Sequence, residues 1–322
     1  MRVVTAEAID GALDCPALVD ALAEAFRSDV VAPVRHHHEI AREGAPATLL
    51  LMPAWTGAAT NGFVGVKVVS VFPDNSTQGL PSVFGAYLLL DGETGRPLAA
   101  FDGARLTAWR TAAASALAAR FLARPDASRM VMVGAGALAP FLIRAHCSVR
   151  PIEDIRLWNR RPERARDLAA ALRDEDLPVE AVEDLEAAMR EADLVSCATL
   201  STEPLVKGAW LKPGAHLDLV GAFNLAMREA DDEALRRAAV HIDTPAAKTE
   251  GGDVALGLQA GVITETDVRG DLRALCRGEA PGRTSPGEIT LFKSVGAAVE
   301  DLAAAMLVWR RLDRPTAGTA AS

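Results

Sequence analysis

The sequence predicts an α/β fold with a doubly wound parallel sheet of the Rossmann type, accompanied by a smaller α+β domain. Three observations carry this prediction. The chain has 322 residues, enough for about two domains of ordinary size. Short extended runs separated by tight turns occupy much of the segment between about residues 47 and 101. From residue 129 onward, extended and helical segments alternate, which is the pattern of a parallel sheet covered by helices on both faces.

The composition supports a folded chain and excludes several classes of protein. Apolar residues make up 50% and charged residues 24%, so the chain can bury a large core. The net charge of −9 argues against nucleic-acid binding. No run reaches the ~18 apolar residues of a membrane span, and the N-terminus lacks the layout of a signal peptide. Four separated cysteines, without a CxxC motif, favour reduced thiols in a cytoplasmic protein.

The first part of the chain predicts one helix followed by an antiparallel sheet. Residues 5–27 carry apolar side chains at helical spacing, and Thr5 can cap this helix. Four strands are then predicted, at residues 47–52, 63–72, 82–90 and 98–101. Asp91-Gly92-Glu93-Thr94-Gly95 supplies a turn between the last two.

The second part predicts a parallel sheet. An alanine-rich helix is expected over residues 107–122, and residues 288–312 are expected to form a long closing helix before a frayed tail. Between them the predicted strands are 129–133, 155–158, 179–182, 194–198 and 216–220, and the predicted helices are 137–149, 162–173 and 184–191.

The strongest local signal is a GxGxxA motif between a predicted strand and a predicted helix. Gly134 permits the tight turn, Gly136 allows close approach of a pyrophosphate, and Ala139 is small enough for close helix–strand packing. The N-terminus of the helix then offers N–H groups and a positive dipole to the phosphates. The structural alternative is an ordinary strand–helix turn.

The tip of the next strand points to the choice of dinucleotide. An NAD site usually has an Asp or Glu there, but Trp158 is followed by Asn159, Arg160 and Arg161. Arg164 lies in the first turn of the following helix. Guanidinium groups at a helix N-terminus suit a 2′-phosphate, so NADP(H) is preferred and NAD(H) is possible. The alternative is a solvated basic helix start.

Six segments together resemble the ornithine cyclodeaminase/mu-crystallin family, over about residues 30–310. They are Gly79-Leu80-Pro81-Ser82, Thr107-Ala108-Trp109-Arg110-Thr111-Ala112-Ala113, Gly134-Ala135-Gly136, Leu211-Lys212-Pro213-Gly214-Ala215-His216, Glu250-Gly251-Gly252-Asp253-Val254 and Leu291-Phe292-Lys293-Ser294-Val295-Gly296. The resemblance implies hydride transfer between a nicotinamide and the α-carbon of an amino or imino acid. It also implies a homodimer, with residues 1–114 plus 289–322 as the substrate-binding and dimerisation domain and 115–288 as the NAD(P)-binding Rossmann domain.

The resemblance implies that Arg35, Lys67 and Arg110 bind substrate, with Lys67 and Arg110 catalytic. Independently, Lys67 lies in an apolar predicted strand, where a charge needs a partner. A guanidinium such as that of Arg110 binds a carboxylate well. Surface charges are the alternative reading of each residue alone. Glu250 is also implied to bind substrate, although it and Asp253 could instead be turn-forming acids.

The cofactor-binding candidates combine the motif residues with positions that the resemblance implies. They are Arg110, Gly134, Gly136, Ala137, Leu138, Asn159, Arg160, Arg161, Arg164, Thr199, Leu200, Val220 and Ser294. Lys293 and Ser294 are expected to start the closing helix. No metal site is expected, because no carboxylate or cysteine pattern completes the His36-His37-His38 run, which is read as a solvated or pocket-rim strand.

Two departures from the family pattern bear on the reaction. Leu138 replaces a glutamine common in the family's turn, and Phe223 occupies the position of the cyclodeaminase catalytic aspartate. Phenylalanine cannot accept a proton. The preferred function is therefore NAD(P)H-linked reduction of a cyclic ketimine carboxylate, such as pyrroline- or piperideine-2-carboxylate. The alternatives are an ornithine cyclodeaminase, which forms proline and ammonia, and a non-catalytic NADP(H)-binding protein.

Overall fold

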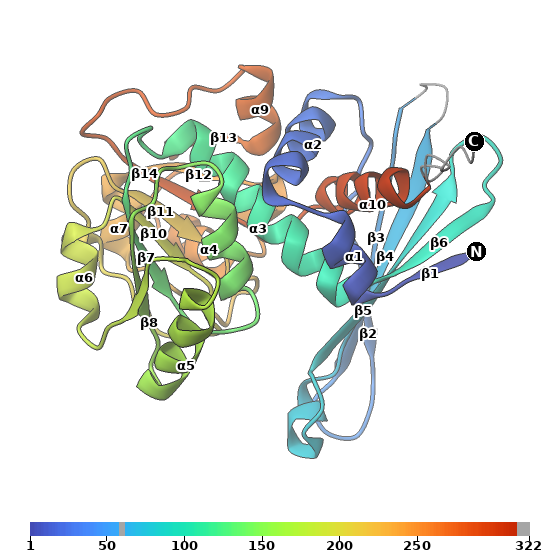
Figure 1. Ribbon diagram of the computed structural model, residues 1–322, viewed down its shortest axis with the longest axis horizontal. Helices are drawn as coiled ribbons and strands as arrows, with labels where there is room; N and C mark the ends of the chain where they lie inside the picture. Colours follow the sequence, from blue (N-terminus) through green and yellow to red (C-terminus); the bar gives the residue numbers. More distant parts are fainter. Residues whose placement is uncertain (58–61, 314–322) are drawn as a thin grey trace, which may run out of the picture. The chain divides into compact units, whose positions relative to one another are not determined.

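The chain forms two compact units. The computed structural model describes residues 1–57 and 62–313. The first unit comprises Met1–Arg110 and Ala297–Ser322, and the second comprises Thr111–Gly296. Figure 1 follows the chain through both units, which are described separately below.

The first unit is built on a six-stranded sheet in the order β1-β6-β5-β4-β3-β2. The strands are β1 (Arg2–Val4), β2 (His36–Ile40), β3 (Ala47–Trp55), β4 (Phe63–Val71), β5 (Val83–Asp91) and β6 (Pro97–Asp102). The four strands predicted from the sequence are confirmed, and their pairing is antiparallel as expected. β1 adds a strand parallel to β6, and β2 extends the opposite edge.

The helix predicted over residues 5–27 is wrong, because two helices occupy this stretch. Thr5 caps α1 (Ala6–Ala12) as predicted, and Asp14 caps α2 (Cys15–Arg27) by accepting a hydrogen bond from Ala17 N at 2.9 Å. In a continuous helix the ring of Pro16 would clash with the carbonyl of Ala12. Pro16 is instead tolerated in the first turn of a new helix.

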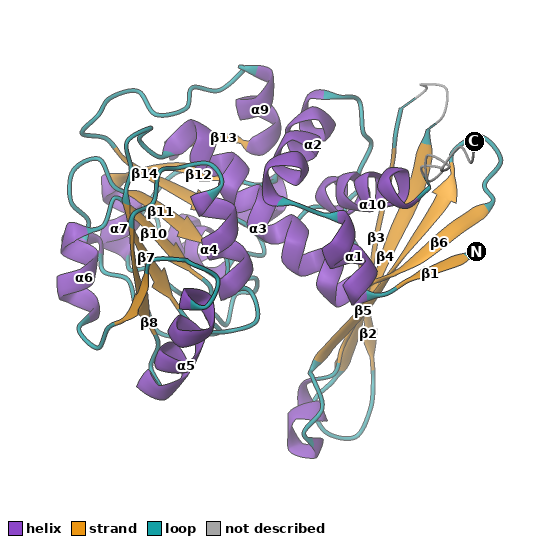
Figure 2. Ribbon diagram, viewed as in Figure 1, coloured by secondary structure: helices purple, strands orange, loops and turns teal. Residues whose placement is uncertain are grey.

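The helices of the first unit pack on one face of its sheet (Figure 2). α10 (Ala298–Leu312) packs against β3, β4 and β5 and against α2. This face carries the buried side chains of Met52 and Tyr87. The opposite face carries apolar side chains that remain partly exposed, among them Val68 at 38% and Phe84 at 48%.

The second unit contains an eight-stranded parallel sheet in the order β13-β12-β14-β11-β10-β7-β8-β9. Its strands are β7 (Arg129–Val133), β8 (Asp154–Trp158), β9 (Val179–Ala181), β10 (Leu194–Cys197), β11 (His216–Leu219), β12 (Ala238–Ile242), β13 (Val268–Asp271) and β14 (Ile289–Lys293). The five strands predicted here are confirmed, and the parallel, doubly wound architecture is as predicted.

Helices cover both faces of this sheet, with α4 and α5 on one side and α6 and α7 on the other (Figure 1). The α-helices other than those of the first unit are α3 (Gly103–Leu122), which begins in the first unit, α4 (Ala139–Cys147), α5 (Pro162–Arg173), α6 (Leu185–Glu191), α7 (Asp232–Arg237), α8 (Gly252–Gln259) and α9 (Leu272–Arg277). Short 3-10 helices lie at Pro73–Gln78, Gly208–Trp210, Pro245–Lys248 and Glu265–Asp267. Within the described ranges, no helix is long and apolar enough to cross a lipid bilayer.

The closing helix predicted over residues 288–312 is wrong at its start. Ile289–Lys293 form β14, whose residues are all buried between β11 and β12, and α10 begins only at Ala298. Residues 289–296, assigned from the sequence to the first domain, therefore lie in the second unit. A strand buried on both faces is a continuous apolar run, which periodicity cannot distinguish from a buried helix.

Candidate active site

The glycine motif forms a strand–helix turn at the carboxyl end of β7. Gly134 has a φ of +108°, and a Cβ added there would lie 2.7 Å from the carbonyl oxygen of Ala198. Only glycine fits this position without strain. A Cβ at Gly136 would meet nothing within 4 Å, so the backbone there borders open space. This geometry fits a pyrophosphate approaching the N-terminus of α4. α4 begins at Ala139, two residues later than predicted.

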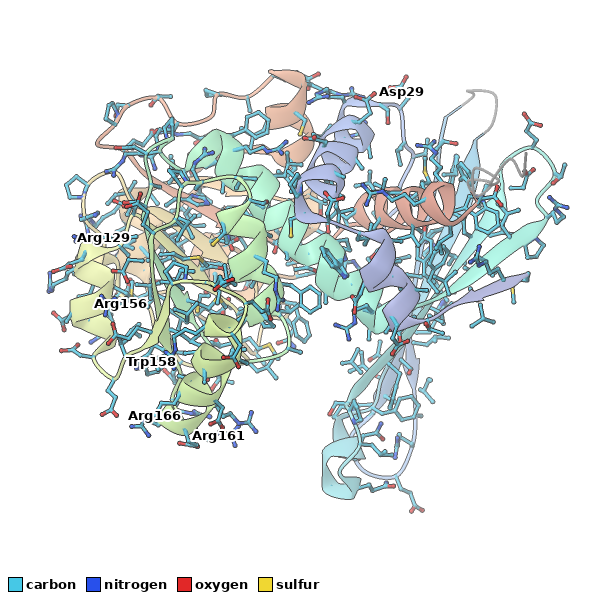
Figure 3. The ribbon with its side chains drawn as sticks, in the orientation of Figure 1. Asp29, Arg129, Arg156, Trp158, Arg161 and Arg166 are labelled. Carbon is cyan, nitrogen blue, oxygen red and sulfur yellow. The ribbon has the colours of Figure 1, made fainter. Side chains whose placement is uncertain are left out.

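The side-chain amide of Asn159 connects the tip of β8 to the glycine turn after β7 by a hydrogen bond. Asn159 Oδ1 accepts a hydrogen bond from Ala135 N at 3.2 Å, and Asn159 Nδ2 donates one to Arg161 O at 3.0 Å. Arg160, Arg161 and Arg164 are exposed around the start of α5. Figure 3 shows Arg161 together with Arg166, whose guanidinium is paired with Glu183 at 2.5 Å. The exposed arginines at the tip of β8 are therefore accessible to an anionic group of a ligand.

The remaining predicted cofactor positions lie where strands end. Thr199 and Leu200 follow β10, and Leu200 is 71% exposed, whereas Val220 follows β11 and is buried. Ser294 follows β14, and its N–H donates to Leu219 O at 3.1 Å. The expectation that Lys293 and Ser294 start a helix is wrong, because Lys293 is the last residue of a buried strand. Ala137 is exposed and Leu138 is half-buried in the turn.

The two acidic residues near the start of α8, Glu250 and Asp253, differ in burial. Glu250 is half-buried just before α8. Asp253, in the first turn of α8, has no exposed surface. Its Oδ1 accepts from the backbone N–H groups of Glu229 and Ala230, and its Oδ2 lies 3.2 Å from Lys293 Nζ. Asp253 therefore faces the interior of the second unit.

In the first unit, Lys67 and Arg110 lie in one buried cluster with two carboxylates of α10. Lys67 Nζ lies 3.0 Å and 2.8 Å from the two carboxylate oxygens of Asp301. Arg110 Nε lies 3.0 Å from Asp301 Oδ1, and Arg110 Nη1 lies 2.8 Å from Glu300 Oε2. We call Lys67, Arg110, Glu300 and Asp301 the cation–carboxylate cluster. Its two cations share Asp301, which fixes their positions relative to one another.

Burial changes the acidity of Lys67. Its side chain is only 3% exposed, and loss of solvation, together with the nearby Arg110 charge, lowers the pKa of Lys67 to about 8 despite the opposing effect of Asp301. Lys67 can therefore hold or release a proton close to neutral pH.

Tyr87 stands opposite Lys67 on the neighbouring strand β5. Burial, and then the Asp301 charge, raise the pKa of Tyr87, so that its hydroxyl keeps its proton. A Cβ at Gly65 would lie 1.9 Å from Tyr87 Oη, so glycine at this position makes room for the phenol.

Sequence reasoning missed Tyr87, Glu300 and Asp301 as members of this region. The available signal was the charged pair Glu300-Asp301 inside an otherwise apolar helical stretch. Both side chains are fully buried, and buried carboxylates require cationic or hydrogen-bonding partners.

The other predicted residues of the first unit lie at its sheet edge. Arg35 is half-buried and immediately precedes β2. His36 and His38 share one face of β2, as predicted, with ring centroids 6.3 Å apart, and the strand is exposed throughout. In the portion of the chain that the structure describes, no group of three or more His, Cys, Asp or Glu residues could hold a metal ion.

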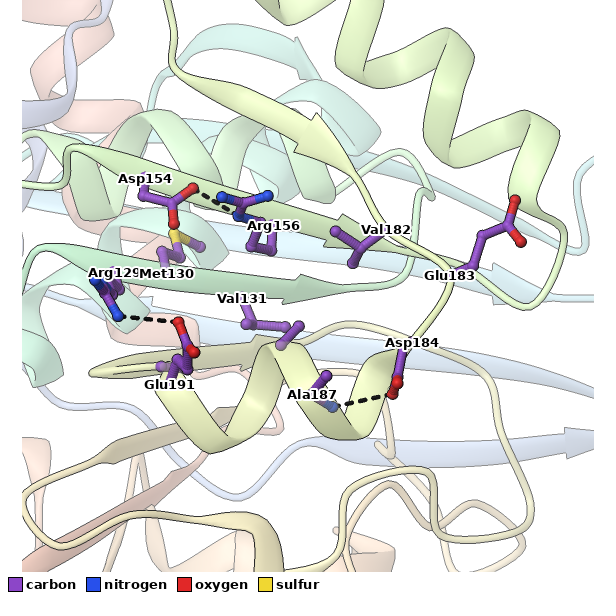
Figure 4. Close-up of a pocket in the computed structure, with 12 residues that line it drawn as sticks. Arg129, Met130, Val131, Asp154, Arg156, Val182, Glu183, Asp184, Ala187 and Glu191 are labelled. Carbon is purple, nitrogen blue, oxygen red and sulfur yellow. Dashed lines mark hydrogen bonds and ion pairs between the residues drawn. The ribbon is translucent and has the colours of Figure 1, made fainter.

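A separate pocket lies along β7 and β8 beside α6 (Figure 4). Two ion pairs lie along it, Arg129 with Glu191 at 3.0 Å and Arg156 with Asp154 at 2.8 Å. The predicted site residues are not among those that line it. Ligand chemistry in the second unit is therefore better sought at the carboxyl ends of the strands, where parallel sheets bind ligands.

Comparison with known proteins identifies relatives across nearly the whole chain. A sequence model of the ornithine cyclodeaminase/mu-crystallin family matches residues 1–315. A Delta(1)-pyrroline-2-carboxylate reductase of Paracoccus denitrificans is 40% identical over 290 residues, which cover 88% of this chain and 92% of that protein.

Two solved structures share the fold over 97% of this chain. The Delta(1)-pyrroline-2-carboxylate reductase of Thermococcus litoralis, in complex with NADH and L-proline, has a TM-score of 0.90 at 32% identity and is itself covered over 97% of its length. An archaeal alanine dehydrogenase dimer with bound NAD has a TM-score of 0.87 at 30% identity, with 95% of that chain covered.

Proposed function

Since the chain belongs to the ornithine cyclodeaminase/mu-crystallin family, we propose that it reduces a cyclic ketimine carboxylate, pyrroline-2-carboxylate or piperideine-2-carboxylate, with NADP(H) as the preferred cofactor and NAD(H) as a second possibility. The observation that carries this proposal is the cation–carboxylate cluster, where a buried lysine with a pKa of about 8 lies beside a fixed guanidinium. The names of the relatives support the substrate class.

In this proposal Arg110 binds the substrate carboxylate and Lys67 manages the proton on the ring nitrogen. Arg35 and Glu250 complete the proposed substrate contacts. Lys67 holds or supplies the proton that the ring nitrogen keeps when the C=N bond is reduced to the amine. Asp301 holds both cations, so that neither has to reorganise when substrate binds.

The cofactor, which supplies the hydride when bound, is proposed to lie at the carboxyl ends of β7, β8, β10 and β11. Gly134 and Gly136 leave room for its pyrophosphate, and Arg160 and Arg161 bind a 2′-phosphate. The other proposed contacts are Arg110, Ala137, Leu138, Asn159, Arg164, Thr199, Leu200, Val220 and Ser294. NADH and NAD are named with the relatives, so the preference for NADP(H) rests on the basic, carboxylate-free tip of β8 alone.

Ornithine cyclisation is disfavoured by Phe223, which is 43% exposed in the loop after β11. That reaction requires proton transfers for deprotonating the amine and expelling ammonia. A positioned general base accelerates such steps by ~10²–10⁴-fold, and phenylalanine cannot act as a base. Reduction of a preformed ketimine has no ammonia to expel, so the loss of this carboxylate affects it less.

We also propose a homodimer formed through the open face of the first unit's sheet. Val68 and Phe84 lie on this face and are substantially exposed, and apolar patches of this kind commonly mark interfaces. Val68→Glu should yield a monomer in light scattering at micromolar concentration. Val68→Thr, which keeps the shape of the side chain, should remain dimeric. A wild-type monomer would contradict the proposal.

Turnover of a substrate panel tests the reaction. The purified protein is incubated with NADPH or NADH and each cyclic ketimine, and with NAD(P)+ and ornithine, proline or alanine. We expect stoichiometric NADPH oxidation with a ketimine, and little ammonia from ornithine. Efficient ammonia release without ketimine reduction would overturn the assignment in favour of a cyclodeaminase. NADPH binding without any turnover would indicate a binding protein.

A further inference from the structure

A single buried carboxylate connects the two loops that follow β10 and β11. Glu229 has no exposed surface and lies beyond the end of β11. Its Oε1 accepts from the backbone N–H and the hydroxyl of Thr199, at 2.7 Å and 2.9 Å. Its Oε2 accepts from the N–H groups of Gly221 and Ala222, at 2.7 Å and 3.2 Å. One side chain therefore satisfies donors of both loops.

The two loops are in close contact at Gly221, where a side chain would not fit. A Cβ added to Gly221 would lie 2.0 Å from Thr199 O and 2.5 Å from Glu229 Oε1. Separating the loops would break up to four hydrogen bonds to a charged acceptor, which are the stronger class of hydrogen bond. The backbone of both loops is thus held in one arrangement.

The carboxylates of Glu229 and Asp253 are both influenced by one buried cation, Lys293. Its backbone N–H donates to Asp253 Oδ1 at 2.7 Å, and Asp253 Oδ2 lies 3.2 Å from Lys293 Nζ at the end of β14. All three side chains are fully buried. Burial raises the pKa of Glu229, and the Asp253 charge adds to that rise, while the Lys293 charge opposes it and favours the ionised form.

We propose that Glu229 is a positioning residue, which holds the Thr199 loop and the Gly221–Ala222 loop in the arrangement that binds the dinucleotide. This inference rests on the proposed function, because Thr199, Leu200 and Val220 are proposed cofactor contacts. Glu229 itself is buried beneath them. Glu229 increases the fraction of protein molecules whose two loops already have the binding arrangement before the cofactor binds. A larger fraction lowers the apparent Kd for the dinucleotide.

The test compares Glu229→Gln with a control substitution at Asp193, at the opposite end of β10. Asp193 immediately precedes β10, is also buried, and accepts from the N–H groups of Ser128 and Arg129, each at 3.0 Å. Asp193 also pairs with Arg124 and Lys212, at 2.9 Å and 2.8 Å. Asp193→Asn therefore perturbs another buried, hydrogen-bonded carboxylate at the other end of β10, away from the two loops. Both variants should lower the midpoint of thermal unfolding, because each removes charge-assisted hydrogen bonds.

Only E229Q should weaken NADPH binding. We expect its Kd to rise about tenfold or more, which corresponds to a competent population of about one tenth. Its kcat at saturating NADPH should stay within about threefold of the wild-type value, because bound cofactor restores the arrangement. Amide hydrogen exchange should increase at Thr199, Gly221 and Ala222 in E229Q, and D193N should keep the wild-type Kd.

Unchanged NADPH affinity in E229Q, or an equal loss in both variants, would show that Glu229 has only a structural role and would overturn the inference while the proposed function stands. Wild-type protein that binds no dinucleotide would overturn both.

If E229Q does not fold, Thr199→Val removes one donor and keeps the side-chain volume. Thr199→Val should increase amide hydrogen exchange at Gly221 and Ala222, which lie on the other loop, and should weaken NADPH binding by less than the factor expected for E229Q. Amide hydrogen exchange at the wild-type rate at Gly221 and Ala222 would overturn the inference.

Discussion

The two units present cations in opposite ways. In the first unit, Lys67 and Arg110 are buried and paired with carboxylates of α10 at 2.8–3.0 Å. In the second unit, Arg160 and Arg161 stand exposed at the tip of β8. Both pairs are proposed to bind an anionic group, a carboxylate in one case and a phosphate in the other.

The difference shows what burial contributes to a binding cation. A buried cation has a fixed geometry and a shifted pKa, but it depends on its carboxylate partners, and removing one member leaves the others uncompensated. An exposed cation keeps its solvation and can be lost at little cost to folding. Substitutions should therefore affect stability and activity together in the first unit, but cofactor affinity alone in the second.

The largest effect is expected for Arg110→Ala. It leaves Glu300 and Asp301 buried with one cation fewer, which should destabilise the fold by about 3–5 kcal/mol and greatly reduce kcat/KM for the ketimine. Urea unfolding and steady-state kinetics measure the two effects. Arg110→Lys keeps the charge but loses the planar fork, so it should recover more stability than activity. Normal stability in R110A would contradict the dependence of the cluster on this charge.

A smaller, pH-dependent effect is expected from Lys67. Its pKa is about 8 in the folded chain against an ordinary value of 10.5. Between these values the unfolded chain binds more protons, so the stability contributed by this group is complete above pH 10.5 and is lost as the pH falls through 8. The difference between these two pKa values amounts to about 3 kcal/mol in the free energy of unfolding.

The Lys67 prediction is measured as a difference between wild type and Lys67→Met. The free energy of unfolding of the wild type should rise relative to that of the variant between pH 8 and 10.5, while its kcat/KM falls over the same range as the proton is lost. A constant difference in the free energy of unfolding across that range would show that Lys67 has an ordinary pKa.

The smallest effect is expected at the exposed tip of β8. Replacing Arg160 and Arg161 with Ala should weaken NADPH binding by about 1.5–3 kcal/mol, with little change for NADH and in the unfolding midpoint. Arg166→Ala, which breaks only the exposed pair with Glu183, should leave both affinities close to wild type. Equal weakening of NADPH and NADH by the double substitution would refute the proposed phosphate contact.

The sequence by itself determined the features that depend on local pattern. The strand–glycine–helix turn at Gly134, the predicted strands of both sheets and the anomalous charge of Lys67 within an apolar strand are all readable from neighbouring residues, because side-chain period and turn chemistry act over a few positions. The change in pattern along the chain predicted two domains, but residues 111–114 and 289–296, which were predicted in the first domain, lie in the second unit.

Only the tertiary structure decided which distant residues meet. Lys67 and Asp301 are 234 positions apart, and Thr199 and Glu229 are 30 apart. It also assigned Ile289–Lys293 to a strand, since pairing with β11 and β12 on both edges outweighs the helix-like run of apolar residues. Periodicity records which face of an element is buried but not what it is buried against. The partners of Lys67, Arg110 and Thr199 are therefore fixed by long-range packing, which places each buried charge beside the groups that stabilise it.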